Sequence, residues 1–239
     1  YTTLFRSSIV EQAEEDNKKV EEIVDEIITE SKDFDTITEK PDMIIVFSYG
    51  VILRDNVLNV APCINIHPSS LPKYRGPSPI KTAILNGDKD MDVCLMRMVN
   101  ELDAGDILMR KNIEIGEKDT NAITESKVSD VAIEMLDKYL ANPDNYVAVP
   151  QNGEPVFTRK FTGADEIIDW KNSAPHIRNQ IRALGCGRTK INGIDVKILE
   201  TKIENNELRI VRIQPAGKNP MDWKSFINGL HGADIKYGE

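Results

Sequence analysis

Along the first 150 residues, apolar residues fall into short clusters separated by polar segments. The apolar stripe formed by Val20, Ile23, Val24, Ile27 and Ile28 has helical spacing and predicts a surface helix. The continuous apolar run 43–47 follows Pro41-Asp42 and predicts a strand that is buried on both faces. Further helices are predicted over 51–58, 78–86 and 120–140, and further strands over 63–67, 93–98 and 107–115.

Alternating helices and buried strands are typical of βαβ units, so we expect an α/β fold with a doubly wound, mostly parallel sheet. The pattern changes after the Pro-, Asn- and Gly-rich stretch 143–155. Ser173 and Pro175 predict the start of an amphipathic helix. Asn205-Asn206 then separates two alternating segments, 195–203 and 207–214, as in a hairpin. This second part is predicted to be a smaller, strand-rich domain.

Four segments follow from these patterns. Residues 1–8 are expected to be a non-native tail, because the string YTTLFRS resembles a translated sequencing adaptor. We assign 9–148 to the first domain, 149–160 to a linker and 161–239 to the second domain.

Composition and charge narrow the classes of function. No apolar run of the 239 residues approaches the length of about 20 that a membrane helix needs. The three cysteines lie far apart, which favours a reducing cytoplasm over a disulfide scaffold. Residues 161–239 carry 12 Lys and Arg against 10 Asp and Glu, whereas 1–160 carry 18 against 29. A nucleic-acid partner is therefore compatible with the second part, although ordinary variation between surfaces explains the charge equally well.

The densest polar group follows the strand predicted at 63–67. Asn65 and His67 alternate along it, so their side chains share one face about 6.6 Å apart. Pro68 ends the strand and places both at its carboxyl end, where open α/β sheets bind ligands. An amide donor beside an imidazole suits stabilisation of an oxyanion together with proton transfer.

Asp103 follows the next long strand, and we expect it at the same edge of the sheet, where it would orient His67 or accept a proton. A structural histidine and a turn-forming aspartate beside Gly105 explain the same residues without catalysis.

Two other classes of function stay open on the sequence alone. A nucleotide-dependent dehydrogenase shares this fold class, but no Gly-x-Gly-x-x-Gly follows a strand. A binding module without catalysis would use Asn65 and His67 structurally. A metal site is not expected, because the three histidines lack ligand spacing.

The motifs Asn65-Ile66-His67-Pro68-Ser69-Ser70-Leu71-Pro72 and Leu102-Asp103-Ala104-Gly105-Asp106 resemble the formyltransferase family that uses 10-formyltetrahydrofolate. Segments 41–50, 168–170, 181–183 and 214–218 fit the same family, especially its members that act on methionyl-tRNA. The resemblance covers roughly 35–230 and implies formyl transfer to the amino group of initiator methionyl-tRNA in the cytoplasm. An amino-sugar nucleotide is the alternative acceptor. Neither a metal nor a protein partner is implied.

The resemblance also implies roles for individual residues. Asn65 and His67 would stabilise the oxyanion, and Asp103 would assist His67. Folate would be held by Ser69, Ser70, Leu71, Pro72, Tyr49, Gly50 and Leu102. The carboxyl-terminal domain of the family is barrel-like and helps to bind tRNA. Its counterpart here offers Arg178, Arg182, Arg188, Lys190, Lys197 and Lys202, which an ordinary solvated surface would explain as well.

Three departures from the family pattern matter. Ser70 and Ala104 replace a Leu and a Thr, and the second domain is shorter around 185–188. The strands with which the family begins are expected to be largely missing. The strand at 43–47 would then lie at an exposed, association-prone edge, and we expect poor activity or aggregation.

Overall fold

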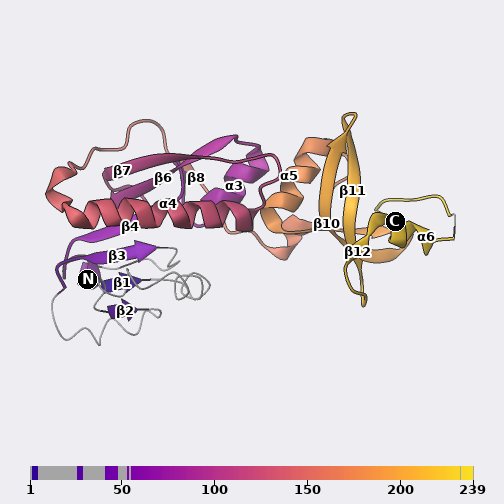
Figure 1. Cartoon of the computed structure of the whole chain (residues 1–239), viewed down its shortest axis with the longest axis horizontal. Coiled ribbons are helices and arrows are strands. Elements are labelled where there is room, and N and C mark those ends of the chain that lie inside the picture. The colour runs from indigo at the N-terminus through magenta and orange to yellow at the C-terminus, as the bar shows by residue number, and fades with distance from the viewer. Residues whose placement is uncertain are drawn as a thin grey trace. The chain divides into compact units, whose positions relative to one another are not determined.

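The computed structural model describes residues 2–4, 26–28, 41–47, 53, 55–231 and 233–238. These residues form two compact units (Figure 1). The first unit takes in the described residues up to Pro79 together with Met91–Ile113 and Lys127–Thr158. The second takes in Ile80–Asp90, Glu114–Ser126 and the described residues from Arg159 onward.

A six-stranded sheet with the order β2-β1-β3-β4-β6-β7 forms the first unit. Its strands are β1 (Thr2–Leu4), β2 (Glu26–Ile28), β3 (Ile44–Phe47), β4 (Cys63–His67), β6 (Asp90–Arg97) and β7 (Ile107–Glu114). The pairs β1–β2, β1–β3 and β3–β4 are parallel, and β4–β6 is antiparallel. The α/β class with a mostly parallel first half is therefore confirmed, but the sheet is mixed.

The start of this sheet corrects two expectations. The strand at 43–47 does not lie at an edge, because β1 pairs with β3 and β2 lies beyond β1. The helix predicted from Val20 to Ile28 falls mostly outside the described residues, and its described part, Glu26–Ile28, is strand β2. Two adjacent isoleucines are β-branched and favour extended backbone when a neighbouring strand is available.

The two faces of β4 bury different side chains. Cys63, Asn65 and His67 share one face with Val46 of β3 and Met96 of β6, which lie directly opposite Asn65. An apolar cluster covers the start of this face; it comprises Ile44, Val46, Leu53, Val57, Ala61 and Cys63. The short helix α2 (Asp55–Leu58) contributes Val57 to that cluster. Apolar packing thus fixes the strand, and its polar residues come at the end.

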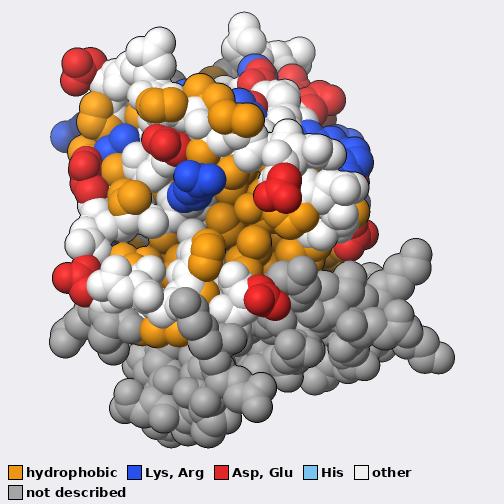
Figure 2. Space-filling model, turned by 90° about the vertical axis from the view of Figure 1, so that its left-hand side faces the viewer, with side chains coloured by type: hydrophobic (Ala, Val, Ile, Leu, Met, Phe, Trp, Pro, Cys, Tyr) orange, Lys and Arg blue, Asp and Glu red, His pale blue; other side chains and the backbone are white. Residues whose placement is uncertain are grey.

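The long helix α4 (Asn121–Ala141) agrees with the helix predicted over 120–140. Val128, Ala132, Met135 and Tyr139 are buried at helical spacing on the part that belongs to the first unit, where the helix lies along the sheet (Figure 1). Figure 2 looks onto the left-hand side of Figure 1. It shows apolar side chains gathered at the centre of this face, with charged side chains around them. No helix in the described ranges is both long enough and apolar enough to cross a bilayer.

The segment after α4 is bound to the first unit rather than extended into solvent. It begins with the 3-10 turn η2 (Pro143–Asn145) and continues through an isolated bridge between Val149 and Ile107. Strand β8 (Val156–Phe157) then pairs with β5 (Lys73–Arg75) in parallel. We call residues 149–158 the strap; all of it falls in the predicted linker, 149–160.

The second unit is built on an antiparallel sheet with the order β12-β11-β10-β9. Its elements are α3 (Pro79–Asn86, from Ile80), η3 (Gly163–Glu166), α5 (Ala174–Leu184), β9 (Gly187–Ile191), β10 (Ile194–Glu204), β11 (Glu207–Pro215), β12 (Met221–Asp222) and α6 (Trp223–Asn228). Ser173 caps α5 as predicted, accepting from the His176 backbone N–H, and Gly185 ends it in the left-handed region. The strand-rich second part is confirmed.

Candidate functional site

Asn65 and His67 stand at the end of β4, which stops before Pro68 as predicted. The His67 residue is 5% exposed, whereas Asn65 is half-buried. The Asn65 side chain forms no hydrogen bond with any described residue, so its amide is free to donate. The Asn65 amide is therefore available to a bound molecule.

The ring of His67 is fixed by a main-chain carbonyl. Its Nε2 lies 3.0 Å from the Tyr74 carbonyl oxygen, and a carbonyl can only accept. The proton of the neutral ring therefore sits on Nε2, which leaves Nδ1 with its lone pair. Tyr74 holds this position with a φ of +65°, a conformation that a bulky residue adopts at a cost of about 1–3 kcal/mol.

Asp103 lies beside that free nitrogen. Its Oδ2 is 3.7 Å from His67 Nδ1 and accepts a hydrogen bond from the Gly76 backbone N–H at 2.7 Å. The structure brings Asp103 beside His67, but not by the route that the sequence predicts, which is a strand end at the same edge of the sheet. Strand β6 runs antiparallel to β4, with Arg97 opposite Ile64 and Cys94 opposite His67. The loop after β6 starts at the far end of β4 and returns along it.

The four residues after β4 that were predicted to hold folate have different environments. Ser69 is fully buried, and its hydroxyl has no hydrogen-bond partner in the part of the chain that the structure describes. The Ser70 hydroxyl accepts from the Asp92 backbone N–H at 3.0 Å. Leu71 is buried, while Pro72 is half-buried. Ser69 therefore retains a free hydroxyl, whereas that of Ser70 is engaged by β6.

Asp92 and Arg110 tie this loop to β6 and β7. Arg110 donates to the Leu71 carbonyl oxygen at 2.7 Å and to Asp92 at 2.8 Å. Burial works against the charged form of Asp92, but hydrogen bonds from Asn112, Arg110 and Ser70 outweigh it and hold the pKa of Asp92 below its ordinary value.

A lowered pKa stabilises the folded state above the unfolded-state pKa of about 3.9, and that stabilisation is lost as the pH falls through the folded-state pKa. We expect Asp92→Asn to lower Tm at pH 7, with a difference from the native chain that shrinks below about pH 4. Thermal unfolding between pH 3 and 7 checks this. A constant difference in Tm across that range would contradict it.

Of the other residues predicted to bind the donor, the structure describes only Leu102. Leu102 is 43% exposed on the returning loop, next to Asp103. Tyr49 and Gly50 lie outside the described residues.

A cavity of about 400 Å³ opens beside Leu71 and Arg110; its other lining residues are Ile107, Leu108, Met109, Val149, Pro150, Gln151 and Asn152. Asn65, His67 and Asp103 do not line it, so the cavity is not the site of the polar triad.

Four of the six basic residues predicted to bind tRNA have different roles in the structure. Arg182 donates to the Asp119 and Gly116 carbonyls, and Arg178 donates to the Glu117 carbonyl, so both guanidinium groups hold the 116–119 turn. Arg188 pairs with Glu166, and Lys190 pairs with Asp195 at 2.8 Å. The last two residues are exposed on the outer face of β9.

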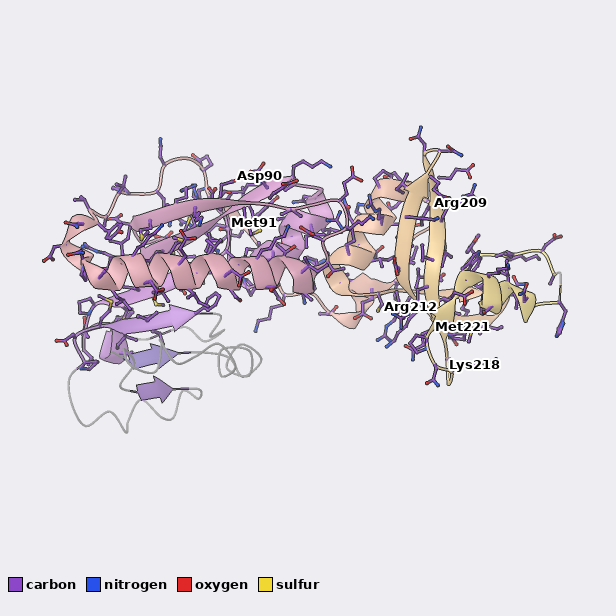
Figure 3. The ribbon with its side chains drawn as sticks, in the orientation of Figure 1. Asp90, Met91, Arg209, Arg212, Lys218 and Met221 are labelled. Carbon is purple, nitrogen blue, oxygen red and sulfur yellow. The ribbon has the colours of Figure 1, made fainter. Side chains whose placement is uncertain are left out.

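Further basic side chains share that outer face. Lys197 lies opposite Arg188, and Lys202 lies opposite Arg209. Arg212 follows on the same strand (Figure 3). Acidic residues are interspersed, since Glu200 lies opposite Arg212. The outer face is thus mixed in charge with a basic excess on β9 and β11.

No group of His, Cys, Asp and Glu in the described part of the chain is arranged as a metal site. Cys63, Cys94 and Cys186 are free thiols, and burial raises the pKa of Cys63 and Cys94 to about 11.

Two family models match this chain. A model described as formyl transferase matches residues 9–140, and one described as the carboxyl-terminal domain of formyl transferase matches 160–208. A methionyl-tRNA formyltransferase of Rickettsia bellii is 33% identical over 216 residues, which are 79% of this chain and 71% of that protein.

Solved structures share the fold. A methionyl-tRNA formyltransferase from Clostridium thermocellum superimposes with a TM-score of 0.74 at 17% identity, over 91% of this chain and 98% of that one. An N-formyltransferase from Helicobacter canadensis, in complex with folinic acid and dTDP-3-aminofucose, gives 0.64 at 18% identity, over 85% and 87% of the two chains.

Proposed function

This chain belongs to the formyltransferase family, and from that premise we propose that it transfers the formyl group of 10-formyltetrahydrofolate to the amino group of methionyl-tRNA. The observation that carries the proposal is the pairing of His67 with Asp103 at the end of β4, on the strand face that also carries Asn65, whose amide has no hydrogen-bond partner among the described residues. The relative from Rickettsia bellii supports this acceptor, because the match to it covers most of both chains.

Residues around the triad fit a folate-type donor. Val99 and Leu102 are 47% and 43% exposed on the loop that carries Asp103, and they offer apolar area to a flat ring system. The Asn65 amide, which has no hydrogen-bond partner among the described residues, offers a polar group to the donor. When bound, the donor would supply an electrophilic formyl carbon. Tyr49 and Gly50 remain proposed contacts.

Asn65 would act on the oxygen of the reacting group. Attack of an amine on a formyl carbon develops negative charge on the formyl oxygen, and a preorganised amide donor stabilises that charge. The amide needs no rearrangement for this, since it makes no hydrogen bond with described residues. Its position is set by Val46 and Met96 on either side.

His67 and Asp103 would take the proton of the attacking amine and pass it to N10 of the donor, whose bond to the formyl carbon would break as the bond to the amine nitrogen forms. The Tyr74 carbonyl fixes the Nε2 proton, so Nδ1 is the nitrogen that accepts a proton. The Asp103 carboxylate, 3.7 Å away, stabilises the imidazolium that results. Gly76 holds Oδ2 through its N–H, which leaves Oδ1 available to the amine.

The second domain, 161–239, would bind the tRNA. The outer face of β9 and β11 supports this role because Arg188, Lys190 and Arg209 are exposed there. Arg178 and Arg182 are assigned instead to structural contacts within the 116–119 turn. The domain limits 9–148, 149–160 and 161–239 remain part of the proposal.

An amino-sugar nucleotide is the second candidate acceptor, favoured by the likeness to the Helicobacter canadensis structure. We expect formyl transfer to initiator methionyl-tRNA with a kcat/KM at least about 100-fold above that for a dTDP-amino sugar, a difference of about 2.7 kcal/mol. The KM for tRNA should rise steeply between 50 and 200 mM salt, because basic residues neutralise phosphates. Faster turnover of the sugar nucleotide would contradict the proposed acceptor and leave the formyl-transfer chemistry intact.

A further inference from the structure

We propose that Gln151 is a positioning residue that holds Asp103 against His67. The inference rests on the proposed function and adds a residue to its site. Gln151 lies on the strap, 48 positions after Asp103 in the chain, and nothing in its local sequence indicates a role in the reaction.

The amide nitrogen of Gln151 binds the loop that carries the carboxylate. Nε2 donates to the Asp103 carbonyl oxygen at 2.8 Å and to the Gly105 carbonyl oxygen at 2.9 Å. Asp103 has a φ of +48°, an uncommon conformation that needs support from its surroundings. Both protons of the Gln151 amide therefore form hydrogen bonds with the backbone of the loop that carries Asp103.

The amide oxygen of Gln151 binds the segment on the other side of the pair. Oε1 accepts from Arg75 Nε at 3.1 Å and from Arg75 Nη2 at 2.9 Å. Arg75 is 8% exposed, and its Nη1 donates to Glu101 at 3.0 Å. Its chain neighbours are Tyr74, which fixes the His67 ring, and Gly76, which holds the Asp103 carboxylate.

One side chain therefore joins the two segments that touch His67 and Asp103. Only a carboxamide can accept twice and donate twice in this arrangement, because a carboxylate has no proton to give. A shift of the loop by about 1 Å would be enough to lower the rate of a positioned reaction.

The strap itself is anchored on both sides of Gln151. Val149 exchanges two backbone hydrogen bonds with Ile107, at 2.8 and 2.9 Å. Further along, the Thr158 N–H donates to the Arg75 carbonyl at 2.7 Å, and the Thr158 hydroxyl accepts from the Ser78 N–H at 3.1 Å. These contacts keep the Gln151 backbone in place when its side chain is changed, so substitution tests the amide alone.

The kinetic test is a double-mutant cycle of Gln151→Glu with Asp103→Asn, measured as formyl transfer. We expect Gln151→Glu alone to lower kcat about 10-fold with the KM of the formyl donor within twofold, and to change kcat less than twofold in the Asp103→Asn background. Asn152→Asp makes the same change from amide to carboxylate at the exposed next position and should leave kcat unchanged. Equal losses in both backgrounds, or no loss, would overturn the role of Gln151.

A second measurement works even if the acceptor has been misidentified. The Gly76 amide donates to Asp103 Oδ2, so its hydrogen exchange reports whether the carboxylate is in place. We expect Gln151→Glu to speed exchange of this amide at least about 10-fold, while Asn152→Asp leaves it at the native rate. Unchanged protection in Gln151→Glu would overturn the proposal, whereas absence of formyl transfer by the native chain would count only against the proposed function.

Discussion

His67→Gln is expected to lower kcat for formyl transfer by about 10²–10⁴-fold. Glutamine can still donate to the Tyr74 carbonyl oxygen, so the buried acceptor keeps a partner and the fold survives. The variant lacks the basic nitrogen that faces Asp103 at 3.7 Å, and with it the group that takes up the proton. Steady-state formyl transfer, together with Tm as a check on folding, measures the effect.

The matched control is His176→Gln, because His176 is an exposed histidine of α5 in the second unit. It should leave kcat within twofold of the native value.

Asn65→Leu removes the amide without a large change in volume and should lower kcat by about 10²–10³-fold, the range seen when one oxyanion donor is lost. A native rate in His67→Gln would reduce His67 to a structural role, and a native rate in Asn65→Leu would do the same for Asn65.

Gly105→Ala is expected to destabilise the first unit by roughly 2–4 kcal/mol and to abolish most activity. A Cβ at this position would lie 1.8 Å from the Arg97 carbonyl oxygen and 2.8 Å from its carbon. Both are main-chain atoms at the end of β6, where the Arg97 N–H also donates to the Asp106 carbonyl. The loop must therefore move, and the Asp103 carboxylate moves with it.

Gly163→Ala is the control for the substitution itself, since a Cβ there meets nothing within 4 Å. It should change Tm little and leave kcat unchanged. Thermal unfolding and kcat, both measured below the Tm of the weaker variant, separate loss of fold from displacement of the loop. If Gly105→Ala matched Gly163→Ala in both, the close contact between Gly105 and Arg97 would not constrain the site.

The core of the site follows from local sequence. The apolar run and Pro68 define β4, and alternation puts Asn65 and His67 on one face, as the structure has them. Helix α5 was predictable for the same kind of reason, because Ser173 and Pro175 mark its start. These signals lie within a few residues of the feature that they specify.

The remainder of the site depends on contacts between distant segments. The orientation of β6 decides how Asp103 arrives, and no pattern within β6 distinguishes parallel from antiparallel pairing. Tyr74 acts through its carbonyl, which every residue possesses, so its side chain gives no signal. Gln151 was assigned to a linker by composition, although its side chain makes four hydrogen bonds.

Sequence patterns did not predict the short strands or distinguish the roles of the basic residues, for related reasons. β5 and β8 pair across about eighty positions of sequence and have only three and two residues, too few for periodicity. β9 buries Gly187 and Ile191 at its ends and is polar between them. Among the arginines, charge alone did not distinguish Arg182, which is bonded to backbone carbonyls, from the exposed Arg188.

A crystal structure with a stable analogue of 10-formyltetrahydrofolate tests the central claim most directly. We expect the oxygen of the formyl group about 2.7–3.1 Å from the Asn65 amide nitrogen, with the formyl carbon between Asn65 and the His67–Asp103 pair. An analogue bound with its formyl group beyond hydrogen-bond reach of Asn65, for example in the cavity beside Leu71 and Arg110, would contradict the catalytic role of the triad.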